Sequence, residues 1–204
     1  MTTFYLIRHA ENDWIGKRLP GWMPGIHLNA QGQMQAEALA AVLAGVRFRA
    51  IYSSPLERAR ETAAPLARAR HLRVVTRAAL GEVRAGEWEG VSLRSLRRRK
   101  LWPLIQRAPS LARFPGGESF VEVQSRLIQE LERLRRLHPR ATLACVSHAD
   151  VVRLAIAHYL GLPLDLFHRL TVAPASISVL RVEPEGARLL CLNDTRALER
   201  APRG

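Results

Sequence analysis

Strand-like and helix-like stretches alternate along this chain. Residues 3–7 and 143–147 are short, nearly continuous apolar runs, which are typical of strands that helices cover on both faces. Two further strands are expected at residues 50–53 and 177–182, and residues 72–76 and 188–192 are weaker candidates. A chain with this alternation folds into an α/β layered structure.

Helical patterns fill the segments between these strands. Four helices are expected, at residues 31–43, 55–70, 120–137 and 150–160. The second one begins with the pattern of a capping box, in which Ser54 is the N-cap, Pro55 takes the first helical position and Glu57 completes the box. The third follows a second such box, Ser119 and Glu122, and carries one apolar stripe at helical spacing.

The predicted fold class is an α/β three-layer sandwich, with a mostly parallel central sheet and helices on both faces. Residues 183–186 read Glu-Pro-Glu-Gly, a hairpin-like turn that predicts an antiparallel edge. At 204 residues the default is a single domain over 1–204. Residues 92–117 break the alternation with basic residues and prolines, so they are expected to be an insertion near one end of the sheet.

The charge of the chain is strongly basic. Its formal net charge is +13, and only two of the 31 basic residues, Lys17 and Lys100, are lysines. This excess is explained either by genome composition or growth temperature, or by attraction of anions such as nucleic acid, acidic lipid or phosphorylated metabolites. The run of residues 97–100 is either a solvated helix face or a basic lip that draws in acidic substrates.

The contexts of the two cysteines and the short apolar run near the N-terminus favour a cytoplasmic location. Cys145 and Cys191 both lie in apolar contexts, so a disulfide framework is not expected and a reducing cytoplasm fits. The apolar run before Arg8 is too short for a signal-peptide core or a membrane span. We therefore expect a soluble cytoplasmic protein without a membrane partner.

Polar side chains follow the predicted strands at the points where these end. Arg8 and His9 follow the first strand, Ser147 and His148 close and follow residues 143–147, and Arg58 lies early in the helix after residues 50–53. In open α/β sheets, ligands bind beyond the carboxyl ends of the strands. Helix N-termini at the same edge favour anions. The sequence therefore predicts an anion-binding pocket there.

These residue types suit phosphoryl transfer. Guanidinium groups bind paired phosphate oxygens, and a histidine is a competent nucleophile toward phosphorus. A second histidine, if protonated, would offset charge on the phosphate. The sequence holds no H-E-x-x-H, no Cys/His cluster and no phosphate-binding glycine loop, so neither a metal nor a cofactor is expected. A proton donor is also needed, and Glu82, Glu87 and Glu89 are all candidates on chemical grounds.

Five segments carry a family resemblance: LIRHAENDW, SSPLERARETA, LGEVRAGEWEG, FPGGES and VSHADVVRLA. In this order, and over most of residues 3–161, they resemble the histidine phosphatase superfamily, also called phosphoglycerate mutase-like. The resemblance implies that His9 is transiently phosphorylated, that Arg8, Arg58 and His148 complete the phosphate pocket, and that Glu82 is the proton donor. The substrate-binding residues it implies are Asn12, Arg18, Gly21 and Ala149.

The sequence departs from the commonest family pattern at three positions. Ala10 and Ala149 stand where a glycine usually follows each histidine, and Ala10 is expected to need a permissive backbone angle. Ile15 stands where many members carry an asparagine. These changes leave the phosphate chemistry intact and put the identity of the substrate in question.

The function predicted from the sequence is a metal-independent phosphatase, a phosphoric monoester hydrolase whose partner is a small phosphorylated metabolite. The first alternative is a phosphoglycerate mutase-type phosphotransferase, although the stretch at residues 92–117 is short for the shielding insertion of such mutases. The second alternative is a basic nucleic-acid-binding protein. The basic residues of this chain are scattered along the sequence, and no recognised motif interleaves aromatic residues with them. No nucleic-acid partner is therefore expected.

Overall fold

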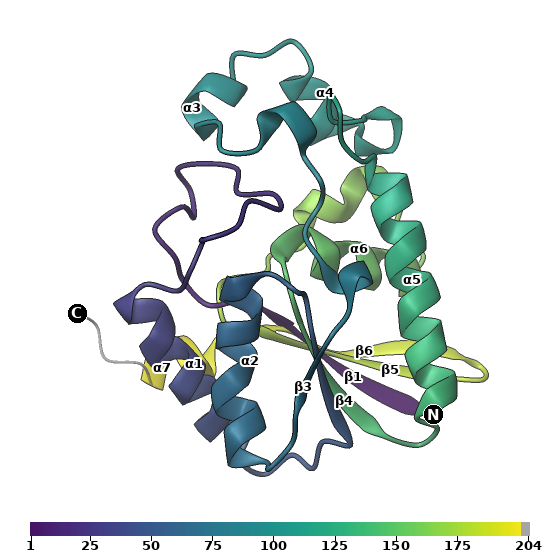
Figure 1. The fold of residues 1–204 in the computed structure, drawn as a ribbon. Coiled ribbons are helices and arrows are strands. Elements are labelled where there is room, and N and C mark those ends of the chain that lie inside the picture. Colours follow the sequence, from purple (N-terminus) through teal and green to yellow (C-terminus); the bar gives the residue numbers. More distant parts are fainter. Residues whose placement is uncertain (201–204) are drawn as a thin grey trace.

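A six-stranded mixed sheet organises the computed structural model, which describes residues 1–200 (Figure 1). The strands lie in the order β3-β2-β4-β1-β5-β6. Their bounds are Thr2–Arg8 for β1, Ala50–Ser53 for β2, Val74–Thr76 for β3, Thr142–Ser147 for β4, Ile177–Glu183 for β5 and Gly186–Asp194 for β6.

The sheet has a parallel part and an antiparallel edge. β1 pairs with β4, β4 with β2, and β2 with β3, all in parallel. β5 pairs antiparallel with β1, and β6 antiparallel with β5 across the turn after Glu183. The predicted fold class, an α/β sandwich with a mostly parallel sheet and an antiparallel edge, is therefore confirmed.

Helices cover both faces of the sheet. On one face lie α1 (Ala30–Val42), α2 (Glu57–Ala69) and the short α7 (Arg196–Arg200), and on the other lie α5 (Phe120–Leu137) and α6 (Ala149–Tyr159) (Figure 1). None of the helices in residues 1–200 is both long and apolar enough to cross a membrane.

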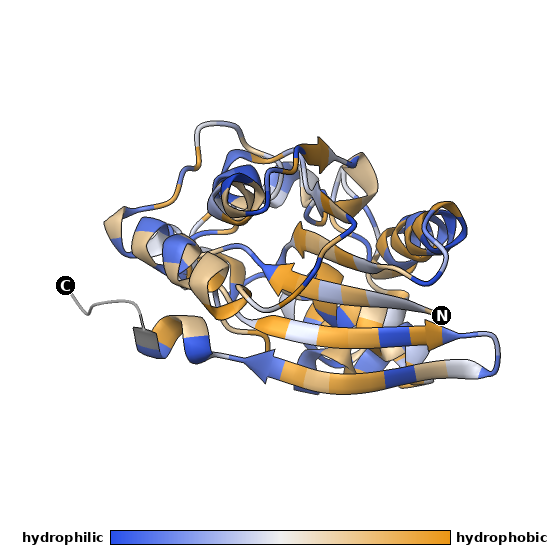
Figure 2. Cartoon of the chain, turned by 90° about the horizontal axis from the view of Figure 1, so that it is seen from below, coloured by the Kyte–Doolittle hydropathy of each residue, from blue (hydrophilic) through white to orange (hydrophobic). Residues whose placement is uncertain are grey.

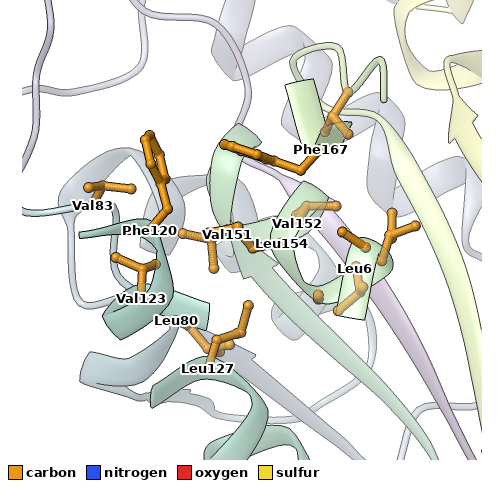
Figure 3. Close-up of a cluster of buried hydrophobic side chains, with 14 of the residues drawn as sticks. Leu6, Leu80, Val83, Phe120, Val123, Leu127, Val151, Val152, Leu154 and Phe167 are labelled. Carbon is orange, nitrogen blue, oxygen red and sulfur yellow. The ribbon is translucent and has the colours of Figure 1, made fainter. Parts of the chain in front are cut away.

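The core lies in two layers because the side chains of each strand alternate between the two faces. In β4, Leu143 and Cys145 pack toward α5 and α6, whereas Ala144 and Val146 pack toward α1 and α2. Seen from below, β5 and β6 form the edge of the sheet with apolar and polar residues interspersed along them (Figure 2). The apolar stripe of α5 contributes Phe120, Val123 and Leu127 to the larger layer (Figure 3).

The two predicted capping boxes have different outcomes. At α5 the box is present, with Ser119 accepting from the Glu122 N–H and the Glu122 side chain accepting from the Ser119 N–H. At α2 the prediction is wrong, because the helix starts at Glu57 with Leu56 as N-cap and has no side-chain cap. The Ser54 hydroxyl is instead hydrogen-bonded to His148 Nε2, at 2.8 Å.

Short helices gather at the carboxyl end of the parallel strands. Residues 92–117 contain α3 (Leu93–Leu96), α4 (Trp102–Arg107) and the 3-10 helix η3 (Pro109–Leu111), which lie at the top in Figure 1 beside the loop between β1 and α1. A backbone bridge between Arg18 and Ser92 joins this loop to the segment. The basic residues 97–100 are exposed. That residues 92–117 are an insertion in a single domain stays a prediction.

Three further 3-10 helices complete the described chain. They are η1 (Ala78–Leu80), η2 (Gly86–Trp88) and η4 (Leu164–Arg169). The first two flank the irregular segment that carries Glu82. The Ser147 hydroxyl, at the end of β4, donates to the Leu80 carbonyl at 2.6 Å. This segment therefore begins at the same edge of the sheet as the end of β4.

Candidate active site

The two predicted histidines meet where β1 and β4 end side by side. Arg8 pairs with Ser147 as the last residues of these parallel strands, so His9 and His148 follow at neighbouring positions. The His9 N–H donates to the Ser147 carbonyl at 2.8 Å. The centroids of the two imidazole rings are 5.2 Å apart, with an angle of 61° between the ring planes. Parallel pairing of two strands distant in sequence therefore brings two imidazoles to one place.

The His9 side chain has the form of a nitrogen nucleophile. Its Nδ1 lies 2.8 Å from the Ala10 carbonyl oxygen, which can only accept, so Nδ1 carries the proton and Nε2 keeps its lone pair. Burial lowers the pKa of His9 well below its usual value, and the positive charges of Arg58 and Arg8 lower it further. The imidazole is therefore neutral near pH 7 and available to attack an electrophile.

His148 is completely buried and bonded to Ser54. The Ser54 hydroxyl oxygen accepts the Leu56 N–H and lies 2.8 Å from His148 Nε2. When the hydroxyl donates its proton to Nε2, the imidazole proton is on Nδ1. That Nδ1 lies 3.7 Å from Glu82 Oε2 and has no hydrogen-bond partner. Burial lowers the pKa of His148 well below its usual value, followed by the charge of Arg58. His148 is thus a neutral donor here, unlike the protonated group considered from the sequence.

Two arginines place buried positive charge beside the histidines. The Arg58 side chain is fully buried, and its Nη2 donates to the Gly21 carbonyl at 2.9 Å. Arg8 Nη1 donates to the Val172 carbonyl at 2.8 Å. Burial lowers the pKa of each guanidinium, while the negative charge of Glu82 is the largest effect that raises it. An anion bound between these guanidinium groups would compensate for the hydration that they lose on burial.

Glu82 is the carboxyl group that reaches this cluster. Its side chain is 16% exposed, and its Oε1 accepts the Val83 N–H at 2.9 Å. Burial, followed by the negative charge of Asp150, raises the pKa of Glu82 to about 7, although Arg58 and Arg8 oppose the rise. Of the two rival carboxylates, Glu87 is exposed and Glu89 accepts the Ala85 N–H at 3.1 Å.

Several donors in this region have no partner within the described protein. Arg8 Nε, Arg58 Nε and Nη1, His148 Nδ1 and Asn12 Nδ2 are all buried and unbonded. Each unpaired buried donor costs about 1–3 kcal/mol, so the gathering of several such donors at one place favours a ligand that supplies acceptors there. A tetrahedral oxyanion offers acceptors in several directions at once.

The four predicted substrate-binding residues have different environments in the structure. Asn12 is buried in the loop after β1, with Oδ1 accepting the Trp14 N–H at 3.0 Å. The Gly21 carbonyl contacts Arg58 as described, and Ala149 is the first residue of α6. The Arg18 side chain is exposed and donates to the Gly90 carbonyl, so it is not part of the buried cluster.

Ala10 causes no backbone strain. It is completely buried, and it is not one of the four non-glycine residues with positive φ in the described chain. The Ala10 N–H donates to Thr62 Oγ1, whose proton is donated to the Arg58 carbonyl at 2.7 Å. The expected need for a permissive angle is therefore wrong, because the loop after His9 is held by α2 in an ordinary conformation.

Sequence reasoning missed supporting residues that contact the cluster. Ser54 orients His148, Thr62 joins the His9 loop to Arg58, and the negative charge of Asp150 affects the pKa of Glu82. Ser54 and Thr62 lie within the segment SSPLERARETA, so the family resemblance marked the segment without their roles. In residues 1–200, no three or more His, Cys, Asp or Glu side chains are grouped so as to hold a metal ion.

Comparisons with known proteins agree on one family. The model described as "Histidine phosphatase superfamily (branch 1)" matches residues 4–195. Phosphoserine phosphatase 1 of Hydrogenobacter thermophilus is 32% identical over 202 residues, which cover 96% of this chain and 93% of that protein. A probable phosphoglycerate mutase of Proteus mirabilis is 31% identical over 182 residues, 87% of this chain and 84% of that protein.

A solved structure from Entamoeba histolytica is similar over the same length. It is a phosphoserine phosphatase in complex with 3-phosphoglyceric acid, and the two chains superpose with a TM-score of 0.88 at 27% identity. The match covers 97% of this chain and 100% of that one.

Proposed function

The chain belongs to the histidine phosphatase superfamily, branch 1, and is a phosphoric monoester hydrolase of that type; we propose that it dephosphorylates small metabolites through a phosphohistidine on His9. The observation that carries this assignment of residues is the group of buried, unpartnered donors on Arg8, Arg58 and His148 around a neutral imidazole. We expect a phosphate bound by those donors to lie within reach of the lone pair of His9 Nε2, since the centroids of the His9 and His148 rings are 5.2 Å apart.

In the first step the phosphoryl group moves from the substrate to His9. The phosphate of the ester binds between Arg8, Arg58 and His148, and His9 Nε2 forms a bond to phosphorus as the ester P–O bond breaks. Protonated Glu82 gives its proton to the leaving oxygen, and its pKa of about 7 suits that task near neutral pH. The positive charge of the two arginines stabilises the transferring group.

In the second step water releases the phosphate. The Glu82 carboxylate takes a proton from a water molecule, whose oxygen then attacks phosphorus as the P–N bond to His9 breaks. The products are inorganic phosphate and neutral His9, and Glu82 is protonated again. The Nδ1–H donated to the Ala10 carbonyl keeps the ring in the tautomer that both steps need.

The proposed substrates are small phosphorylated carboxylic acids. Two similar proteins support this class, since one is named a phosphoserine phosphatase and the other holds 3-phosphoglyceric acid. The net charge of +13 favours the approach of such multiply charged anions.

Phosphate release from a panel of metabolites tests this function. The panel contains phosphoserine, 3-phosphoglycerate, sugar phosphates and nucleoside monophosphates. We expect turnover of at least one phosphorylated acid, and loss of turnover in His9→Ala with the fold retained. His158→Ala is the matched control, since His158 is exposed near the end of α6, and it should keep full activity. Turnover by folded His9→Ala would reject the mechanism.

A mutase is the second candidate function, because one relative is a probable phosphoglycerate mutase. A mutase would pass the phosphoryl group from His9 to another hydroxyl group of the substrate instead of water. Incubation with 3-phosphoglycerate separates the two functions. We expect free phosphate, whereas formation of the 2-phospho isomer without phosphate release would favour the mutase.

We also propose a cytoplasmic location and no nucleic-acid partner. Both cysteines are free, which suits a reducing compartment. Binding to random duplex DNA at physiological ionic strength would contradict the second part of this proposal.

A further inference from the structure

We propose that Trp22 is a positioning residue, whose indole N–H fixes the segment that carries Glu82. The inference rests on the proposed function, since it concerns how the proton donor is held relative to the phosphate-binding arginine. Trp22 lies in the loop between β1 and α1, far in sequence from Glu82. Its Nε1 nevertheless donates to the Glu82 main-chain carbonyl at 2.5 Å.

The indole ring is fitted closely against this segment. A Cβ atom at Gly81 would lie 2.2 Å from Cζ2 of Trp22, so the ring packs directly on the backbone preceding Glu82. The guanidinium carbon of Arg84 lies 3.8 Å from the centroid of the indole ring, a cation–π contact. The ring therefore contacts the residues on both sides of Glu82.

A second donor holds the same segment from α5. Arg126 donates to the carbonyls of Ala79, Gly81 and Glu82, the last at 2.9 Å from Nη2, and it is paired with Glu118. Arg126 thus attaches the segment to the core helix, whereas Trp22 attaches it to the loop beside the site. Of these two contacts, the one from Trp22 joins Glu82 to the neighbour of Gly21, whose carbonyl accepts from Arg58.

The link between Glu82 and Arg58 runs through two adjacent residues, Gly21 and Trp22. The Gly21 carbonyl accepts from Arg58 Nη2 at 2.9 Å, and the next residue donates to Glu82. Gly21 has φ +47°, and a Cβ there would lie 2.5 Å from the Glu89 side chain, so the carbonyl position depends on glycine. Gly21 and Trp22 therefore set the distance between the arginine that binds phosphate and the carboxyl that protonates the leaving group.

The consequence is specific to proton donation. Misplacing a catalytic group by about 1 Å costs up to about 100-fold in rate. The loss falls on substrates whose leaving group must be protonated, such as alkyl phosphates. It spares kcat/KM for p-nitrophenyl phosphate, because p-nitrophenolate leaves without a proton. The later hydrolysis of the phosphohistidine, in which Glu82 is the base for every substrate, does not enter kcat/KM.

Trp22→Phe tests the inference, because it keeps an aromatic ring and removes the N–H. We expect kcat/KM for an alkyl phosphate to fall about 10-fold or more, and kcat/KM for p-nitrophenyl phosphate to fall less than about 3-fold. Inhibition by inorganic phosphate should stay unchanged, since Arg58 is still in place. Benzothienylalanine at position 22 matches the shape of tryptophan without the N–H. It should lower kcat/KM for the alkyl phosphate and spare kcat/KM for p-nitrophenyl phosphate in the same way, and it is informative even if Trp22→Phe folds poorly.

Trp102→Phe is the matched control. Trp102 is the first residue of α4 and stacks on Trp88. Its indole N–H has no bond to any described residue, so turnover of neither substrate should be affected. An equal fall with both substrates, or no fall with either, in the two Trp22 variants would overturn the inference. The proposed function fails separately, if the wild type releases no phosphate or if His9→Ala remains active.

Discussion

At the scale of single residues, burial acts in opposite directions on the acid and on the histidines of this site. It raises the pKa of Glu82 to about 7 and lowers the pKa of His9 and His148 well below the usual value. In both cases the neutral form is favoured, because desolvation disfavours charge. The outcome near pH 7 is a protonated or half-protonated donor beside an unprotonated nucleophile, which is the pairing that the first chemical step requires.

The raised pKa of Glu82 predicts a pH-dependent effect of Glu82→Gln on stability. Between the ordinary carboxyl pKa of 4.5 and about 7, folded Glu82 keeps a proton that the unfolded chain has lost, so this group destabilises the fold as the pH rises. Glutamine removes that penalty. Relative to the wild type, the variant should gain up to about 3 kcal/mol in unfolding free energy between pH 4.5 and pH 8.

Urea unfolding of both proteins at the two pH values measures this gain. His9 and His148, with lowered pKa values, have the opposite pH dependence, but they are present in both proteins and largely cancel. Glu87→Gln, at an exposed side chain, is the control and should give no comparable pH-dependent difference. A constant difference between Glu82→Gln and the wild type across this range would contradict the raised pKa.

At the scale of elements, α5 both builds the core and holds the segment of the proton donor. Its buried stripe packs on the sheet, and Arg126 on its partly buried side bonds the carbonyls around Glu82. Its first turn is fixed by Ser119 and Glu122, and Arg113 pairs with Glu122 from outside the helix. The start of this helix therefore contributes to stability independently of the chemistry.

Removal of the α5 cap predicts a loss of stability without a loss of activity. Ser119→Ala deletes the oxygen that accepts the Glu122 N–H and should cost about 1 kcal/mol, or about 2–4 °C in Tm. Ser125→Ala makes the same chemical change at an exposed position inside α5 and should be neutral or slightly stabilising. Thermal unfolding measures both. Equal melting temperatures for the two variants would contradict the cap.

The elements were more predictable than the contacts between them. The strands and helices follow from apolar periodicity, and all six strand signals correspond to strands, because each buried face leaves its pattern in the sequence. The start of α2 was mispredicted since the local signal at Ser54 competes with a tertiary bond to His148. The contact of Trp22 with Glu82 leaves no periodic trace at all, so only the folded chain reveals it.

The same distinction applies to the candidate site. Parallel strand order explains why Arg8, His9 and His148 could be expected together, since the carboxyl ends of β1 and β4 are adjacent. Arg18 differs, because a loop residue has no strand to fix its side chain, and its guanidinium is bonded to the Gly90 carbonyl at the surface. The choice of Glu82 over Glu87 and Glu89 came from family resemblance, and burial supplies a physical reason for it.

At the scale of the whole molecule, the net charge of +13 and the buried guanidinium groups both oppose folding in the absence of an anion. An oxyanion that binds to this site in the folded protein, and not to the unfolded chain, offsets part of this cost in folding free energy. The stability of the molecule is therefore expected to depend on the binding of an anion at this one site.

Inorganic phosphate should consequently raise the melting temperature. At a phosphate concentration of 100 times Kd, the folded state gains about 2.7 kcal/mol, which corresponds to about 5–10 °C for a chain of this size. Differential scanning calorimetry with phosphate, and with sodium chloride at matched ionic strength as the control, measures the shift. A shift of equal size with chloride would assign it to general screening of charge.

The covalent intermediate is the central claim, and rapid acid-free quenching of a reaction with a turned-over phosphomonoester tests it most directly. Peptide mass spectrometry should place one phosphoryl group on His9, formed within the first turnover, stable to base and labile to acid. With p-nitrophenyl phosphate, whose leaving group needs no proton, the corresponding peptide of Glu82→Gln should accumulate more of it, since the base that activates water is missing. Steady turnover with no phosphorylated His9 peptide at any time, or with the phosphoryl group on another residue, would contradict the account.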